Sequence, residues 1–119
     1  MGLDSYFQVN GEPITDDRLK EISLCGGMLS GNGCDGSFRG KVYDPFIGEI
    51  TGGNVSLYVK EQDVGDYSEV PVAIGKFLEE NPDKEQFEFN YQLDRKEIQD
   101  LKILFEVAVD LKAKLFGWW

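Results

Sequence analysis

A glycine-rich stretch, residues 33–41, holds the side chains with the clearest potential for chemistry in this chain of 119 residues. Five of its members combine backbone freedom with two positive charges: Gly36, Ser37, Arg39, Gly40 and Lys41. A glycine-rich loop that leads into a helix presents unpaired backbone N–H groups, and such groups bind phosphates and carboxylates. The stretch therefore predicts a site for a small anionic ligand, with Arg39 and Lys41 adding charge.

The same stretch does not match a nucleotide-binding P-loop. The spacing from Gly36 to Gly40 is one residue too short for G-x-x-x-x-G-K, and Val42 stands where a magnesium-binding Ser or Thr belongs. Two further interpretations remain open beside the anion site. The stretch can be an irregular loop built around tight turns, or a surface loop that contacts a protein partner.

Catalytic chemistry has little support in the residue types. The chain contains no histidine, which excludes Ser-His-Asp and Cys-His catalysis within it and also histidine-ligated zinc. Its two cysteines, Cys25 and Cys34, can form a local disulfide or remain free thiols, and alone they cannot close a structural zinc site. An enzymatic role is uncertain and disfavoured, and we expect no cofactor and no metal.

Charge narrows the range of partners. The chain has 22 acidic and 12 basic residues, a net charge of −10 and a pI of about 4.3. Such a surface repels phosphate backbones and anionic lipid, so neither direct nucleic-acid binding nor membrane binding is expected. The acidity favours solubility, or alternatively serves a decoy that mimics nucleic acid. No run of 18 apolar residues and no signal-peptide pattern occurs, which predicts a cytoplasmic location.

Two aromatic residues, Trp118 and Trp119, end the sequence. Such a pair either folds back over the core or forms an exposed apolar patch. Because exposed contiguous aromatic residues usually mark an interaction surface, the second arrangement predicts a protein partner or self-association.

The element expected to position all of these residues is a long amphipathic helix over residues 95–116. Asp94 and Glu97 have the spacing of a capping box at its start, and Gly117 is expected to end it. The apolar side chains of this segment recur at helical spacing and would supply most of the core. They are Ile98, Leu101, Leu104, Phe105, Ala108, Val109, Leu111, Leu115 and Phe116.

Three shorter helices are expected beside it. One covers residues 16–23 with Thr15 as its cap, and a second covers residues 37–51 with a kink or a start at Pro45. A third covers residues 69–80. Its apolar side chains are expected to turn inward: Val70, Val72, Ile74, Phe77 and Leu78.

Alternating apolar and polar residues predict strands at residues 3–10, 55–60 and 86–93. The fold class is therefore α+β, a small and mostly antiparallel sheet packed against helices, with the long C-terminal helix as its core element and a single domain over residues 1–119. The favoured function is a non-enzymatic cytoplasmic binding or regulatory protein of bacterial or phage type. The alternatives are an anionic-ligand-binding domain that uses residues 33–41 and an acidic inhibitor that mimics nucleic acid.

Overall fold

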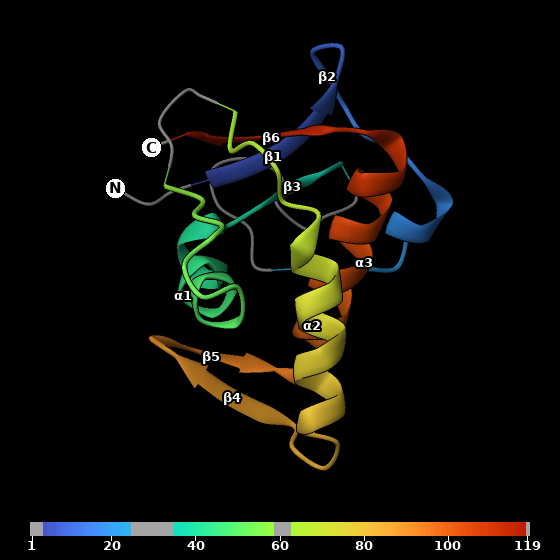
Figure 1. Ribbon diagram of the computed structural model, residues 1–119. Coiled ribbons are helices and arrows are strands. Elements are labelled where there is room, and N and C mark those ends of the chain that lie inside the picture. The colour runs from blue at the N-terminus through green and yellow to red at the C-terminus, as the bar shows by residue number, and fades with distance from the viewer. Residues whose placement is uncertain (1–3, 25–34, 59–62, 119) are drawn as a thin grey trace.

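The computed structural model describes residues 4–24, 35–58 and 63–118, and for Trp118 only the main chain. It confirms an α+β fold in which three helices pack with small antiparallel sheets (Figure 1). Cys25, Cys34 and Trp119 lie outside the described residues. In chain order the elements are β1 (Asp4–Val9), β2 (Glu12–Pro13), the 3₁₀ turn η1 (Asp17–Leu19), β3 (Ser37–Phe38), α1 (Gly40–Ile50), α2 (Glu69–Glu80), β4 (Gln86–Phe89), β5 (Tyr91–Asp94), α3 (Arg95–Leu111) and β6 (Lys114–Trp118).

Helix α3 is the central element, and its first turn is fixed by the predicted capping box. The Asp94 carboxylate accepts the Glu97 N–H at 2.8 Å, and the Glu97 carboxylate accepts the Asp94 N–H at 3.2 Å. These two bonds satisfy backbone donors that a helix start otherwise leaves unpaired. The apolar side chains that α3 buries are Ile98, Leu101, Leu104, Phe105, Val107 and Ala108.

The prediction of a helix over residues 95–116 is wrong at its C-terminal end. Lys112, with a left-handed φ of 56°, caps the helix. Gly117 is not a cap, because it lies in β6 opposite Ser5 of β1. Apolar residues continue at helical spacing past the turn, but the hydrogen bonds of a strand pairing outweigh that local pattern.

Strand β1 is the centre of the larger sheet. β6 runs antiparallel along one edge of it, from Asp4 opposite Trp118 to Gln8 opposite Lys114, whereas β2 and β3 share the other edge. Phe7 of β1 points into the core and its ring meets that of Phe105 of α3 edge-on, with 5.1 Å between centroids. The C-terminal helix thus packs on the sheet, as expected.

Of the three predicted strands, the larger sheet contains only the one predicted at residues 3–10. Residues 55–58 form no strand, and residues 86–93 belong to a separate hairpin of β4 and β5 that turns at Asn90 with φ 66°. The rings of this hairpin pack on α1 and α2, where Phe89 lies 5.1 Å from Phe46 and Phe87 lies 4.9 Å from Phe77. Alternation within one segment gives no information about which strand it pairs with.

Two predicted helices are shorter than expected. The helix over residues 16–23 reduces to η1, and its cap is Asp16 rather than Thr15. The second begins at Gly40, neither at residue 37 nor at Pro45, because the two residues before Arg39 pair with β1 as β3. Pro45 is accommodated inside α1. Helix α2 has the predicted bounds.

Arg95 fixes the end of α2 to the start of α3. Its guanidinium donates to the carbonyl oxygens of Asn81 at 2.6 Å, Lys84 at 3.2 Å and Leu78 at 3.3 Å. A cation at this place gives further donors to carbonyl groups at and just after the end of α2 and complements the helix dipole. The two helices are therefore held side by side, as Figure 1 shows.

Leu104→Ala tests the central role of α3. Leu104 is fully buried, so the substitution should lower the free energy of unfolding by about 2–5 kcal/mol, through lost transfer energy and the cavity that remains. Urea unfolding of the two proteins measures the difference. A loss of less than about 1 kcal/mol would contradict the buried position of this side chain.

Asp44 gives a second test, at the contact between α1 and the segment after it. Its carboxylate accepts the N–H of buried Leu57 at 2.8 Å, and burial raises the pKa of Asp44 above its usual 3.8. A carboxyl whose pKa is raised on folding gives stability that is present below pH 3.8 and is lost as the pH rises through the folded value.

Asp44→Asn removes the charge and keeps an acceptor, so we expect it to be at least as stable as the wild type at neutral pH. That advantage should vanish at about pH 3, where Asp44 is protonated in both states. Asp44→Ala leaves the Leu57 N–H unpaired and should cost about 1–3 kcal/mol. Equal losses in the Asn and Ala variants at neutral pH would refute this account of Asp44.

Candidate functional site

The predicted anion site spans the end of a turn, β3 and the start of α1. Gly36 adopts a φ of +84°, and its carbonyl accepts the Phe7 N–H at 2.8 Å. A Cβ at this position would lie 2.8 Å from a side-chain carbon of Ile14 and 3.0 Å from the Phe7 carbonyl oxygen. Close packing against β1 therefore requires the glycine at position 36, and no ligand is needed to explain it.

Acidic side chains already contact the polar groups of this segment. Arg39 lies 3.6 Å from the carboxylate of Asp4, which is only 2% exposed. The N–H and hydroxyl of Ser37 both donate to Asp35. Lys41 lies half-exposed on the first turn of α1, and Gly40 is buried beside it. Binding of an anion here stays a prediction, and an incoming anion would have to compete with the two carboxylates.

Of the two predicted partner-binding residues, Trp118 and Trp119, the structure describes only the main chain of Trp118. The main chain of Trp118 pairs with Asp4 at the end of β6. Its side chain and the whole of Trp119 lie outside the described residues. Whether these rings fold back or form an exposed patch stays a prediction.

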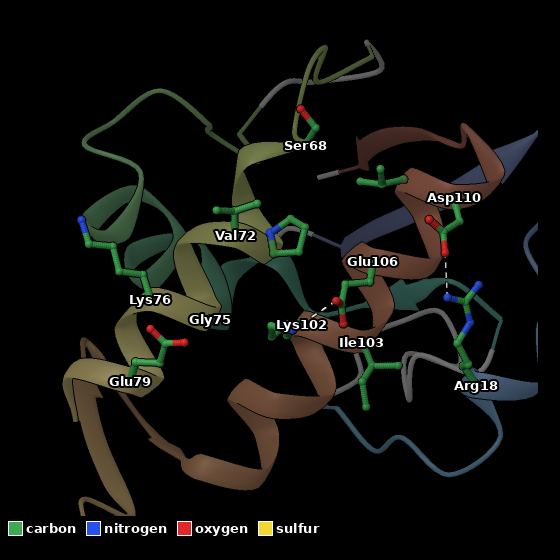
Figure 2. A pocket seen from close by; sticks show the side chains of 12 residues that line it. Arg18, Ser68, Val72, Gly75, Lys76, Glu79, Lys102, Ile103, Glu106 and Asp110 are labelled. Atoms are coloured by element: carbon green, nitrogen blue, oxygen red, sulfur yellow. Dashed lines mark hydrogen bonds and ion pairs between the residues drawn. The ribbon is translucent and has the colours of Figure 1, made fainter. Parts of the chain in front are cut away.

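An open groove of about 790 Å³ lies between α2 and α3. Figure 2 shows its side chains projecting from these two neighbouring helices, with Arg18 beside the last turns of α3. The lining residues are Arg18, Ser68, Pro71, Val72, Gly75, Lys76, Glu79, Lys102, Ile103, Glu106, Val109 and Asp110.

Helix α2 presents an exposed valine and a glycine to the groove. Val72 is 73% exposed, so the prediction that it turns inward is wrong. It lies two residues from Val70 and from Ile74, and both of those are fully buried, so a helix must place it on the opposite side. Gly75 has no side chain to fill the groove, and a Cβ there would meet only Lys102 Cε, at 3.2 Å.

Ion pairs line the α3 side of the groove. Arg18 bridges Asp110 at 2.7 Å and Asp16 at 3.0 Å, although Asp110 is 92 residues distant in sequence. Lys102 pairs with Glu106 at 3.1 Å, one turn along the helix. These side chains are partly exposed, so the pairs orient the walls of the groove more than they stabilise the fold.

The contacts with Arg18 change the pKa of Asp16. Hydrogen bonds from the Arg18 side chain, and then from its backbone N–H, lower the pKa of Asp16 from 3.8 to about 2. The side-chain hydrogen bonds from Arg18 to Asp16, and then to Asp110, raise the pKa of Arg18 above its already high usual value. Both groups are therefore charged throughout the physiological range, and the end of the groove carries a fixed ionic bridge.

A smaller hollow of about 380 Å³ lies on the other side of α2 and shares Lys76 with the groove. Its walls combine the half-buried rings of Phe77 and Phe89 with the carboxylates of Glu49 and Glu80. Helix α2 thus forms a ridge with a depression along each side.

No group of three or more His, Cys, Asp or Glu side chains capable of holding a metal ion occurs within the described ranges. No helix in the same ranges has the length and apolar character needed to cross a membrane. Comparisons with protein-family models, curated proteins and solved structures gave no match.

Sequence reasoning missed the groove, although one signal for it was present. Val72, Gly75 and Lys76 occupy the side of the 69–80 helical wheel opposite Val70 and Ile74. Val72 is thus an apolar residue on the solvent side of an amphipathic helix. The contribution of Arg18 had no signal, since its partner Asp110 is remote in the sequence.

Arg18→Gln should raise the pKa of Asp16 from about 2 towards 3.8, because the side-chain hydrogen bonds are lost while the backbone one remains. The stability that this contact gives is present above pH 3.8 and is lost as the pH falls towards 2. Carboxyl NMR titration measures the change. Lys20→Gln is the control, because Lys20 pairs with Asp17 instead. An Asp16 that titrates near 3.8 in the wild type would refute the bridge.

Proposed function

We propose that this chain is a non-enzymatic, cytoplasmic protein that acts by binding a protein partner through the groove between α2 and α3. The observation that carries the proposal is the exposed side chain of Val72, beside half-buried Gly75 and among charged residues, in a groove of about 790 Å³. Apolar contact area in the middle with polar groups around it is the usual composition of a protein interface.

The shape of the groove supports a polypeptide as its ligand. It is open along two helices, and α2 has 12 residues, which corresponds to about 18 Å of contact length. A cleft between helices accepts the apolar face of a third helix or an extended segment. A small metabolite is instead favoured by an enclosed pocket with a few convergent polar groups.

Electrostatics argue against the alternative ligands. A net charge of −10 opposes binding to a nucleic-acid backbone. The anionic-ligand alternative at residues 33–41 is weakened because Arg39 faces Asp4 and Ser37 donates to Asp35. The acidic inhibitor that mimics nucleic acid stays an untested alternative.

Affinity capture from native cells with matched bait variants tests the proposal. Val72→Glu places a charge at the exposed apolar position of the groove, and Tyr91→Glu places the same charge on an exposed aromatic residue of β5, outside the groove. We expect the wild type and Tyr91→Glu to retain a partner that Val72→Glu loses, because burying an unpaired carboxylate opposes binding.

Cross-linking locates the contact independently of the variants. Amine-reactive cross-linkers should join the partner to Lys76 and Lys102, the two lysines of the groove, in preference to Lys84 of the hairpin side. Melting curves must show that Val72→Glu remains folded, as its exposed position predicts. A partner that binds Val72→Glu as tightly as the wild type would refute the proposed site.

A further inference from the structure

The groove between α2 and α3 differs electrostatically from the rest of the chain. Its lining holds three basic residues (Arg18, Lys76 and Lys102) and three acidic residues (Glu79, Glu106 and Asp110). Since the chain has 12 basic and 22 acidic residues, the other positions hold nine and nineteen. The groove is therefore balanced in charge, and the whole excess of −10 lies elsewhere.

The equal numbers of positive and negative side chains in the groove favour some partners over others. A basic protein would be drawn to the acidic remainder of the surface and would gain no net attraction from the groove. A strongly acidic protein would be repelled everywhere except at a surface without net charge. One acidic protein is certain to be present at the same concentration as this chain, and it is another copy of the chain.

We propose that the occupant of the groove is a second copy of this chain, packed groove to groove about a two-fold axis. This inference rests on the proposed function, since it names the partner for the same site. A two-fold interface brings one patch against itself, so each copy must supply both signs of charge and an apolar surface of its own. The groove supplies the exposed Val72 and charges of both signs. Arg18 and Lys102 already pair with Asp110 and Glu106 within the chain, so Lys76 and Glu79 of α2 are the charges that would meet across the axis.

The surface of α2 is suited to such close packing. The helix is a ridge with hollows on both sides, and ridges of one helix pack into grooves of another. Gly75 has no side chain of its own, and the atom nearest to its missing Cβ is the flexible end of Lys102, whose Cε would lie 3.2 Å away. Another backbone can therefore approach Gly75 once the Lys102 side chain moves aside. Val72, with 73% of its surface exposed, would gain burial on pairing.

Analytical ultracentrifugation of the reduced full chain over a range of concentrations and salt tests the inference. The reductant prevents Cys25 and Cys34 from linking copies covalently. We expect a reversible dimer whose dissociation constant falls as sodium chloride rises, because salt screens the repulsion between two chains of charge −10 and leaves the apolar contact intact. A complex held by opposite net charges would weaken with salt instead.

Two matched pairs of variants place the dimer contact. Val72→Glu should raise the dissociation constant at least about tenfold, and Tyr91→Glu should change it less than about threefold. Lys76→Glu changes the groove from balanced to a net charge of −2 and should weaken the dimer at low salt. Lys84→Glu makes the same charge change outside the groove and should have a much smaller effect.

The possible failures are distinguishable. A wild type that stays monomeric at about 1 mM, or a dimer that Val72→Glu leaves unchanged, overturns the second copy as occupant. The proposed function survives the first of these results if cellular capture still yields a partner that Val72→Glu loses. It fails if neither a dimer nor such a partner depends on Val72.

Discussion

The packing around Phe105 is the constraint on which the rest of the structure depends. This ring, from the middle of α3, meets Phe7 of β1 at 5.1 Å, Phe38 of β3 at 6.0 Å and Tyr67, just before α2, at 5.7 Å. Aromatic rings bury large areas and prefer tilted or edge-on contacts, so the cluster fixes orientation as well as distance. Strands β1 and β3 and the turn before α2 thus meet helix α3 at this one side chain.

Polar contacts at the edge of this cluster fix the neighbouring elements. Glu97, already part of the capping box of α3, also accepts a hydrogen bond from the Tyr43 hydroxyl of α1 at 2.7 Å. Tyr67 donates its hydroxyl to the Ala113 carbonyl, and desolvation raises the pKa of Tyr67 to about 12. Together with the Arg95 bonds to the end of α2, these contacts leave one face of α2 unburied. The groove lies between α2 and α3, the two helices that the Arg95 bonds hold together.

A glycine and a cation near the start of a helix do not by themselves form an anion site. Gly36 and Arg39 resemble parts of an anion cradle, yet one is explained by close packing on β1 and the other faces a buried carboxylate. The groove residues Val72 and Gly75, in contrast, have no motif in the sequence that distinguishes them from other helix residues. Only their position beside α3 makes them part of the groove lining.

The sequence by itself determined the elements whose signals are local. The capping box of α3 and the bounds of α2 follow from residues within a turn or two of each other, because caps and helical periodicity act over that distance. Only the tertiary structure decided that residues 114–118 form a strand on β1, that residues 86–94 fold as their own hairpin and that Arg18 meets Asp110. Strand pairing and remote ion pairs depend on which segments meet, and short segments with similar apolar patterns do not specify that choice.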